Sequence, residues 1–164
     1  MRCLRKHLCK AEIMSRNVDI VSQENLKEAA GVHAAAWRES HRSVCSVEFI
    51  REHTTQRQME YIRCAINQGK RFFVLTDDVP VAVVSVDGSI IADLYVHPDY
   101  QRRGYGTCLL EYAMTQCNGN PSWWVMNINR DARRLYERCG FVPSGQTKKL
   151  KDGLFEIEMK YKKG

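Results

Sequence analysis

A glycine-bearing turn in the middle of the chain carries the residue types that bind a phosphate group. It follows a strand-like run, residues 91–96, and consists of Gln101, Arg102, Arg103, Gly104, Tyr105, Gly106 and Thr107. Apolar residues then recur with helical spacing, at Leu109, Leu110, Ala113, Met114 and Cys117. A helix is therefore predicted to begin at this turn.

The start of such a helix favours an anion. Its first amides have no partner within the helix, and the helix dipole is positive there. Gly104 and Gly106 remove side chains that would keep a phosphate at a distance, while Arg102 and Arg103 add positive charge. An ordinary strand-turn-helix with two solvated arginines explains the same residues, so both interpretations stay open at this point.

The spacing excludes two other phosphate-binding loops. A dinucleotide fingerprint needs a third glycine three residues after the second, where this chain has Leu109. A P-loop needs Lys and then Ser or Thr after its last glycine, whereas Gly106 is followed by Thr107 and Cys108. The pattern that remains is Gln-x-x-Gly-x-Gly.

This pattern resembles the signature loop of the GNAT superfamily of acyl-CoA-dependent N-acyltransferases. In that family the loop reads Arg/Gln-x-x-Gly-x-Gly/Ala and follows a strand of the form Leu-x-Val-x-Pro, which Leu94, Val96 and Pro98 match here. A second block resembles the family's Asn-x-x-Ala…Tyr…Gly-Phe segment, through Asn129, Ala132, Tyr136, Gly140 and Phe141. Both blocks have the family's order and spacing. The first half of the chain matches more loosely, through residues 37–40.

The resemblance implies a site for acetyl-CoA. Its cofactor-binding residues would be Leu94, Tyr95, Val96, Gln101, Arg102, Arg103, Gly104, Tyr105, Gly106, Thr107 and Asn129. Amides of residues 102–107 would hold the pyrophosphate, the main chain of residues 94–96 would pair with the pantetheine arm, and the Val96 amide would polarise the thioester carbonyl. Leu94 and Val96 also suit a buried strand, which is compatible because different atoms serve the two roles. Asn129 suits a helix N-cap equally well.

The family's reaction transfers an acetyl group from acetyl-CoA to a primary amine of a small molecule, or of a peptide or protein, by direct attack. An alkyl amine with a pKa of about 10.4 arrives mostly protonated, so the site needs a base, an oxyanion donor and an acid for the leaving thiolate. Tyr136 stands where the family commonly places the tyrosine that acts as this acid, and a phenol is neutral at physiological pH. A core tyrosine on the apolar face of its helix is the alternative.

The residue types do not identify the base. Positions that align with the family's catalytic carboxylates hold Ile90 or Ala92, and Trp124. Asp93 is the nearest acid and therefore the candidate catalytic residue beside the tyrosine. Strand alternation puts Asp93 on the face opposite Leu94 unless the strand is bulged, so a structural or substrate-facing role fits it equally.

Other bases and other functions stay open as well. His33, Glu39 and His41 on the early helices, or an ordered water chain, are further candidates for the base. Without an effective base, the chain would be an acyl-CoA-binding or sensing module with little catalytic activity. Nucleic acid is not expected as a partner, because the surplus of Lys and Arg over Asp and Glu, 25 to 19, is spread along the chain.

Composition indicates one globular domain, residues 1–164. With 44% hydrophobic residues the chain can bury a core without disulfides, and residues 1–10 are expected to form a flexible or extra N-terminal segment. The seven cysteines are odd in number and lack Cys-x-x-Cys spacing, which predicts reduced thiols and a cytoplasmic protein. Cys3, His7 and Cys9 have no second ligand pair nearby, so no metal is expected. No apolar run is long enough to span a membrane.

The hydrophobic pattern predicts an α/β fold. An extended segment, residues 13–21, precedes Ser22 as the N-cap of a first helix, and a second helical region is broken near Thr54 and stops at Gly69. Strands are expected at residues 71–75, 81–86, 89–96, 123–126, 141–150 and 154–161, with a turn at residues 77–80. Together with helices after residues 106 and 129, they predict a single-domain mixed, mostly antiparallel sheet flanked by helices, the GNAT-like fold. A homodimer joined through sheet edges is compatible with such a sheet.

Overall fold

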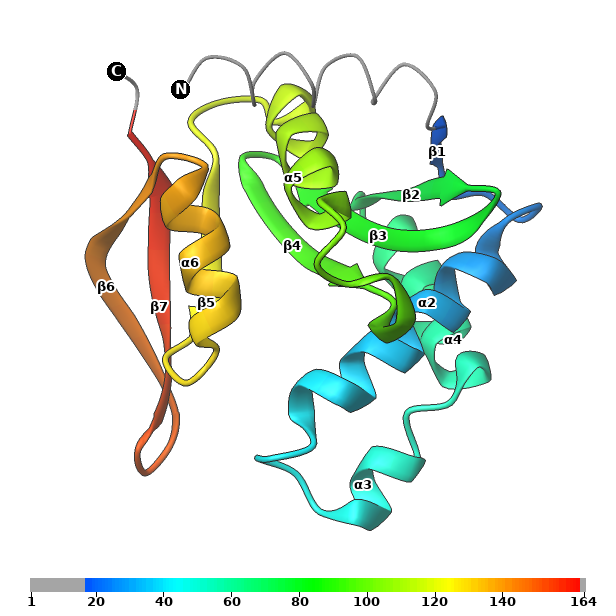
Figure 1. Ribbon diagram of the computed structural model, residues 1–164, viewed down its shortest axis with the longest axis horizontal. Coiled ribbons are helices and arrows are strands. Elements are labelled where there is room, and N and C mark those ends of the chain that lie inside the picture. The colour runs from blue at the N-terminus through cyan, green and yellow to red at the C-terminus, as the bar shows by residue number, and fades with distance from the viewer. Residues whose placement is uncertain (1–16, 163–164) are drawn as a thin grey trace.

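The computed structural model describes residues 17–162, and seven strands in that range form one sheet. The strands are β1 (Asn17–Ile20), β2 (Arg71–Asp77), β3 (Val79–Asp87), β4 (Ile90–Val96), β5 (Ser122–Met126), β6 (Phe141–Lys151) and β7 (Leu154–Tyr161). The helices are α2 (Leu26–His41), α3 (Val47–Arg51), α4 (Thr55–Asn67), the 3-10 turn η1 (Pro98–Tyr100), α5 (Tyr105–Gln116) and α6 (Arg130–Arg138). The strand order is β1-β2-β3-β4-β5-β7-β6, and only β4 and β5 are parallel neighbours (Figure 1). The predicted mixed, mostly antiparallel α/β fold is confirmed.

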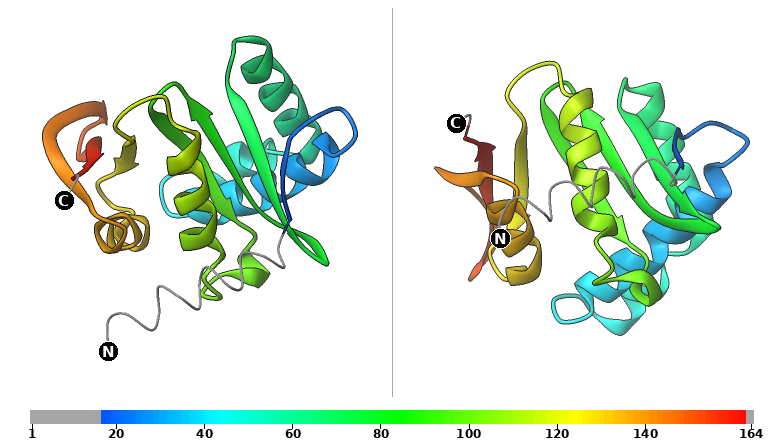
Figure 2. Two further views of the ribbon diagram at one scale, coloured as in Figure 1. Left: turned by 90° about the horizontal axis from the view of Figure 1, so that it is seen from above. Right: turned by 45° about the horizontal axis from the view of Figure 1, so that its top comes forward.

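Helices cover both faces of the sheet. On one face α5 and α6 pack against a core that includes Leu109, Leu110 and Tyr136, and on the other α2 and α4 pack around Ile62 and Val83. Figure 2 shows α5 on the side of the sheet opposite α2 and α4. The central strand β3 is buried on both faces, which explains why its sequence is almost continuously apolar instead of alternating.

The parallel pair β4 and β5 separates soon after it forms. Its pairing consists of Ile90 with Ser122 and Ile91 with Trp123, and the strands then diverge. From Ala92 onward, the edge of β4 that faces β5 has no sheet partner. A split of this kind leaves backbone donors and acceptors exposed in the middle of the molecule.

A β-bulge lies in β4 beside this split. Ser85 pairs with Ala92 and Val83 with Tyr95, so β4 has one more residue than β3 across this stretch. Asp93 lies within the bulge and has a left-handed φ of 49°. Because β4 is bulged at Asp93, simple strand alternation does not decide which faces Asp93 and Leu94 occupy.

Two details of the predicted elements are wrong. Helix α2 begins at Leu26 with Asn25 at the N-cap position, because Ser22 accepts a hydrogen bond from Glu24 N in the turn before it. The turn between β2 and β3 is confined to Asp78, and Pro80 lies within β3, paired with Thr76.

The break at Thr54, the stop at Gly69 and the remaining strands and helices lie where they were predicted. Within residues 17–162, no helix has the length and apolarity to cross a membrane, and no group of three His, Cys, Asp or Glu side chains is arranged to hold a metal ion. The expectations for residues 1–10, for residues 13–16 of the extended segment, and for Cys3, His7 and Cys9 lie outside the described residues.

Candidate active site

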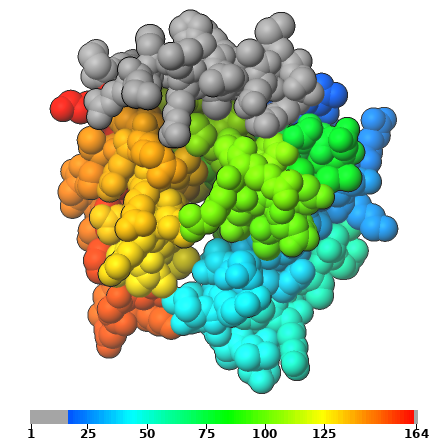
Figure 3. Space-filling view, viewed as in Figure 1, coloured from blue at the N-terminus to red at the C-terminus, as the bar shows by residue number. Residues whose placement is uncertain are grey.

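A cleft of about 890 Å³ opens where β4 and β5 separate. Its turn end consists of residues 101–102 and 104–107 with the first turns of α6. Its hairpin end consists of the last turn of α2 with Leu150 and Glu156 of the β6–β7 hairpin. Figure 3 shows this face of the molecule hollowed between α6 and the segments of α2 and α5. The two ends of the cleft therefore come from different parts of the chain and carry different chemistry.

Two glycines shape the turn end in different ways. Gly104 precedes α5 with a φ of 85°, a left-handed conformation that costs a residue with a Cβ about 1–2 kcal/mol. A Cβ on Gly106 would lie 3.3 Å from Leu135 Cδ2 and 3.5 Å from Val96 Cγ2. Gly106 thus allows α5 to approach α6 and β4 closely, in addition to leaving the turn open.

Two early amides of α5, those of Gly106 and Thr107, are available to an anion. The first hydrogen bond within the helix runs from Cys108 N to Gly104 O at 3.0 Å. The amides of Gly106 and Thr107 precede it without a partner in the helix, and both residues line the cleft. A helix start with free amides is a favourable site for a phosphate.

The two arginines of the turn lie differently. Arg102 lines the cleft, and its guanidinium is 3.8 Å from the Asp131 carboxylate across the turn end. The Arg103 guanidinium lies 5.2 Å from the centre of the Tyr100 ring and donates to Asp99 O at 3.2 Å. Arg102 is therefore the arginine available to a bound anion, while contact of the Arg103 side chain with a cofactor stays a prediction.

Polar side chains hold the turn against the sheet. Gln101 donates from Nε2 to Val96 O at 3.2 Å, which ties the signature glutamine to the last residue of β4. The Tyr105 hydroxyl donates to Asp77 Oδ2 at 2.5 Å, which anchors the start of α5 to β2. These contacts give Gln101 and Tyr105 a role in positioning the free amides.

The side chains of β4 divide between the two faces of the sheet. Leu94 and Val96 pack against the core under α5, as buried strand residues should. Tyr95 packs on the α2 side, with its ring 4.7 Å from the His33 ring. All three residues line the cleft, so their main chain borders the same space that their side chains enclose.

Tyr136 belongs both to the core and to the cleft. It is 2% exposed, and its ring lies 4.6 Å from Trp123 and 6.1 Å from Phe141. Its hydroxyl has no hydrogen bond within residues 17–162. Burial, with smaller contributions from Tyr95 and Cys139, raises the pKa of Tyr136 well above its usual range. The phenol is therefore held in its protonated form, the form that can donate.

Asp93 is surrounded by donors beneath the α2 side of the cleft. The Tyr61 hydroxyl lies 3.1 Å from both carboxylate oxygens, and Ser85 Oγ donates to Oδ2 at 2.7 Å. His33 Nε2 lies 3.3 Å from Oδ1. Helices α2 and α4 and strand β3 thus each direct one side chain to the carboxylate of the bulge.

The environment of Asp93 stabilises its charged form. Burial opposes ionisation, but the hydrogen bond and charge of His33, the hydrogen bond of Ser85 and the charge of Lys70 outweigh it and lower the pKa of the carboxyl. A carboxylate with a lowered pKa and occupied oxygens takes up a proton poorly. A role as the general base stays a prediction, and the contacts favour a positioning role.

The remaining candidates separate into cleft and core residues. Asn129 caps α6, because its side chain accepts from Ala132 N at 3.1 Å, and it also lines the cleft. Glu39 and His41 line the hairpin end. His33 is 2% exposed and bonded to Asp93 instead.

Sequence reasoning did not single out Tyr61, Ser85 or Glu156. The first two contact the bulge from distant parts of the chain, and nothing in their sequence neighbourhood signals this. The sequence around Glu156 indicates only that its side chain alternates with apolar residues along a predicted strand. Its place at the cleft follows from the strand order, which the sequence does not specify.

Comparison with known proteins agrees with this geometry. A family model described as an acetyltransferase (GNAT) domain matches residues 68–143, the range that contains β4, the turn, α5 and α6. Over this range the chain is similar to GNAT acetyltransferase domains. The matched range therefore contains both predicted sequence blocks and most of the residues that line the cleft.

Individual acetyltransferases are similar to part or most of this chain. The [ribosomal protein bS18]-alanine N-acetyltransferase of Escherichia coli (strain K12) is 35% identical over 47% of this chain, and the match spans 60% of that protein. PaiA N-acetyltransferase of Thermoplasma acidophilum, solved with coenzyme A, has a TM-score of 0.65 and 20% identity, covering 90% of this chain and 100% of that one. YncA of Salmonella typhimurium, solved with acetyl-CoA, has a TM-score of 0.65 and 15% identity, covering 90% and 94%. These two structures share the fold.

Proposed function

We propose that this protein is an acetyl-CoA-dependent N-acetyltransferase that acetylates a primary amine. The observation that carries the proposal is the cleft, in which a helix start with free amides, an unpaired strand edge and a buried tyrosine hydroxyl lie along one channel. The two solved relatives that hold coenzyme A or acetyl-CoA share this fold, which supports the choice of cofactor. The shape suits a long ligand with a phosphate-rich end and an extended amide-bearing arm.

The residues present fit acetyl-CoA. The amides of Gly106 and Thr107 and the Arg102 guanidinium would hold the pyrophosphate at the turn end. The free main-chain groups of residues 92–96 would pair with the amides of the pantetheine arm, as an added strand pairs with a sheet edge. When bound, acetyl-CoA would supply a thioester as the activated acetyl group.

The chain's own groups then divide the work of proton transfer. The Val96 amide is the candidate donor to the carbonyl oxygen. The Tyr136 hydroxyl, protonated because of its raised pKa, is the candidate acid for the departing sulfur. Asp93 would act as a fixed anion that orients Tyr61 and His33 at the wall of the cleft.

The acceptor and the setting are parts of the same proposal. The E. coli relative's name specifies an alanine of a ribosomal protein, so a peptide N-terminus is one acceptor class, and a small-molecule amine is the other. A cytoplasmic setting is supported by Cys45, Cys64 and Cys117, which are free thiols. A homodimer through the sheet edges stays a prediction.

Calorimetric titration with acetyl-CoA tests the cofactor, with NAD and adenosine 3′,5′-bisphosphate as comparators. We expect affinity in the micromolar range for acetyl-CoA and none for NAD. Thiol release with an alanine-initiated peptide, a lysine-containing peptide and 1,4-diaminobutane then tests transfer. Binding without release above the blank would favour the acyl-CoA-binding module, and no binding at all would contradict both functions.

Tyr136→Phe tests the acid. We expect kcat to fall by about 100-fold while acetyl-CoA affinity stays unchanged, because the lost proton transfer acts only in the transition state. Tyr112→Phe is the matched control, since Tyr112 packs on Phe73 outside the cleft. Equal rates for Tyr136→Phe and the unaltered protein would remove Tyr136 from the mechanism.

A further inference from the structure

One carboxylate in the cleft is left without a partner. The four carboxylates that line the cleft are Glu39, Asp93, Asp131 and Glu156. Glu39 and Asp131 pair with arginines at 2.6 and 3.8 Å, and the Asp93 oxygens are occupied by hydroxyls and an imidazole. Within residues 17–162, Glu156 has no side-chain hydrogen bond or ion pair.

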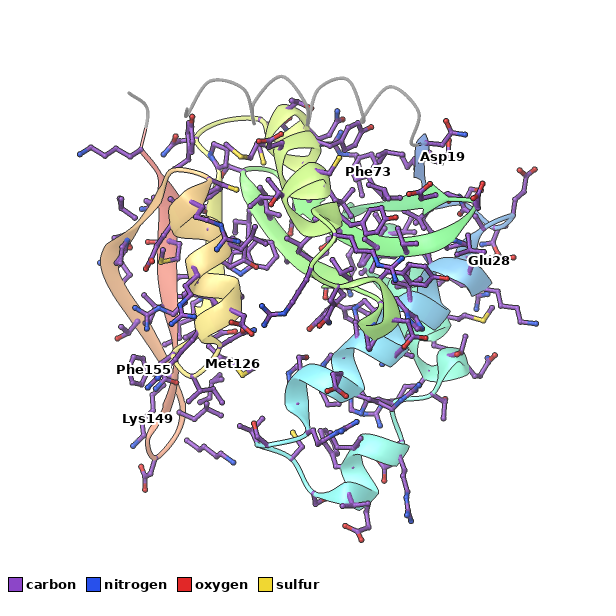
Figure 4. All side chains as sticks on the ribbon, viewed as in Figure 1. Asp19, Glu28, Phe73, Met126, Lys149 and Phe155 are labelled. Atoms are coloured by element: carbon purple, nitrogen blue, oxygen red, sulfur yellow. The ribbon has the colours of Figure 1, made fainter. Side chains whose placement is uncertain are left out.

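The sheet places Glu156 on the α2 side of the cleft. Strand β7 lies between β5 and β6, and Glu156 pairs in register with Met126 on one side and Lys148 on the other. Its neighbour Ile157 packs into the core under α5 and α6, so alternation turns Glu156 to the opposite face. Figure 4 shows Met126 and the adjacent Phe155 close together at this end of β5 and β7. Glu156 is thus at the hairpin end, away from the amides of the turn.

The surroundings of Glu156 suit a cationic group. Trp124 provides an aromatic wall, and the Lys148 ammonium already lies 3.6 Å from the centre of its ring, which shows that the wall accepts a cation. Burial is the main cause of the raised pKa of Tyr95 in β4, and the charge of the nearby Glu156 carboxylate makes a small contribution to it. Titratable groups of the helices that line the cleft are Glu39 and His41 of α2, and Asp131, Arg134, Tyr136 and Arg138 of α6. Helix α6 covers the opposite face of the sheet.

We infer that Glu156 is the carboxylate that binds the acceptor's ammonium group and accepts its proton. This inference rests on the proposed function. The positions that align with the family's usual bases hold Ile90 or Ala92, and Trp124, so the proton acceptor has moved to the next strand of the sheet. Both Asp93 oxygens already accept hydrogen bonds, and Glu39 is paired with Arg42, whereas Glu156 has neither kind of partner among residues 17–162.

The acceptor's ammonium group loses two protons in the reaction, one to Glu156 and one to Tyr136. Glu156 takes one proton from the ammonium, which leaves a neutral amine with its lone pair. The carbon–nitrogen bond forms and the carbon–sulfur bond breaks, with no change of oxidation state. Tyr136 gives its proton to the sulfur and regains one from the acylated nitrogen, directly or through water. The proton on Glu156 is released to solvent, so one acetamide, one thiol and one proton leave for each ammonium consumed.

Glu156→Gln tests the inference, with Glu158→Gln as the matched control. Glu158 lies on the same face of β7, but it is bound to Ser144 and Lys160 and does not line the cleft. With the alanine-initiated peptide at pH 7, we expect Glu156→Gln to lower kcat by about 100-fold and Glu158→Gln to leave it unchanged. The deficit should narrow toward pH 9.5, where an α-amine of pKa about 8 arrives already neutral.

Two further readouts separate a chemical role from a structural one. Glu156→Asp should recover part of the rate, and acetyl-CoA affinity by calorimetry should match that of the unaltered protein in all three variants. Calorimetric binding of the peptide to the coenzyme A-loaded protein should weaken about tenfold in Glu156→Gln alone, because the ammonium loses its counter-charge.

The outcomes distinguish the two proposals. An active Glu156→Gln variant with the unaltered pH profile and peptide affinity would overturn the role of Glu156 and leave the transferase function standing. An unaltered protein that binds acetyl-CoA but transfers to none of the three amines would overturn the transferase function, and Glu156 as its base with it.

Discussion

The polar groups of the cleft fall into two sets at the scale of single residues. The Asp93 carboxylate is surrounded by Tyr61, Ser85 and His33, whereas the Tyr136 hydroxyl and the Glu156 carboxylate have no hydrogen-bond partner among residues 17–162. A polar group whose hydrogen bonds are all made within the protein holds its neighbours in place. A polar group without a hydrogen-bond partner can exchange a proton with a ligand. We therefore assign stability to Asp93 and chemistry to the other two.

Asp93→Asn should lower the free energy of unfolding by about 2 kcal/mol at pH 7, because hydrogen bonds to a charged group contribute roughly 1.5–3 kcal/mol. The pKa of Asp93 is lower in the folded protein than its usual 3.8. Its contribution is therefore present above that usual value and is lost as the pH falls through the lower folded-state pKa. The difference between the variant and the unaltered protein should shrink below about pH 4.

Urea unfolding at pH 7 and pH 3 measures this difference. Asp152→Asn is the control, since Asp152 is an exposed partner of Lys149 and should change stability little at either pH. An Asp93→Asn deficit of equal size at both pH values would contradict the assignment.

At the scale of elements, the junction of β4, the turn and α5 does most to shape the turn end of the cleft. Gly104 sets the direction in which α5 leaves the turn, and Gly106 sets how closely α5 lies to α6 and β4. The glycines of the motif thus serve the packing of the backbone as much as the approach of a ligand.

Gly104→Ala separates these effects when it is compared with Gly145→Ala. Both glycines have left-handed φ values, 85° and 91°, so both variants should lose about 1 kcal/mol of stability. Gly145 lies in β6, outside the cleft. Only Gly104→Ala should weaken acetyl-CoA binding, by about tenfold, because it shifts the amides of α5. Calorimetry and thermal unfolding measure the two quantities, and equal affinity in both variants would show that the turn tolerates the change.

At the scale of the whole molecule, the sheet consists of two parts joined by a short seam. Strands β1 to β4 and strands β5 to β7 meet only at Ile90–Ser122 and Ile91–Trp123. At the hairpin end the Lys151 ammonium reaches across to Val44 O at 3.2 Å. A ligand that lies in the split would contact both parts and complete the hydrogen bonding of β4.

Hydrogen exchange should detect this completion. The amides of residues 92–96 that face β5 should exchange slowly when acetyl-CoA is bound and rapidly when it is absent, because the ligand arm supplies the missing acceptors. Adenosine 3′,5′-bisphosphate, which lacks the arm, should protect only amides near the start of α5. Protection of residues 92–96 by both ligands would mean that the cleft closes on itself instead of pairing with the arm.

Most elements could be predicted because their signals are local. Helical spacing after Gly106, the hairpin at Asp87 and Gly88, and the alternating final strands each depend on neighbours within a few residues. The errors at Ser22 and Pro80 are local as well, since a turn hydrogen bond moved the helix start and strand pairing extended β3 to include the proline.

The sequence by itself determined the glycine-bearing turn before α5, the order of helices and strands, and the tyrosine of the second block, because each is specified by residue types at fixed short spacing. The tertiary structure decided which carboxylates are bound and which is free. It brings Tyr61 and His33 to Asp93 through packing of α4 and α2, and it places Glu156 at the cleft by inserting β7 between β5 and β6. Such contacts join residues 30 or more positions apart, so no local pattern encodes them.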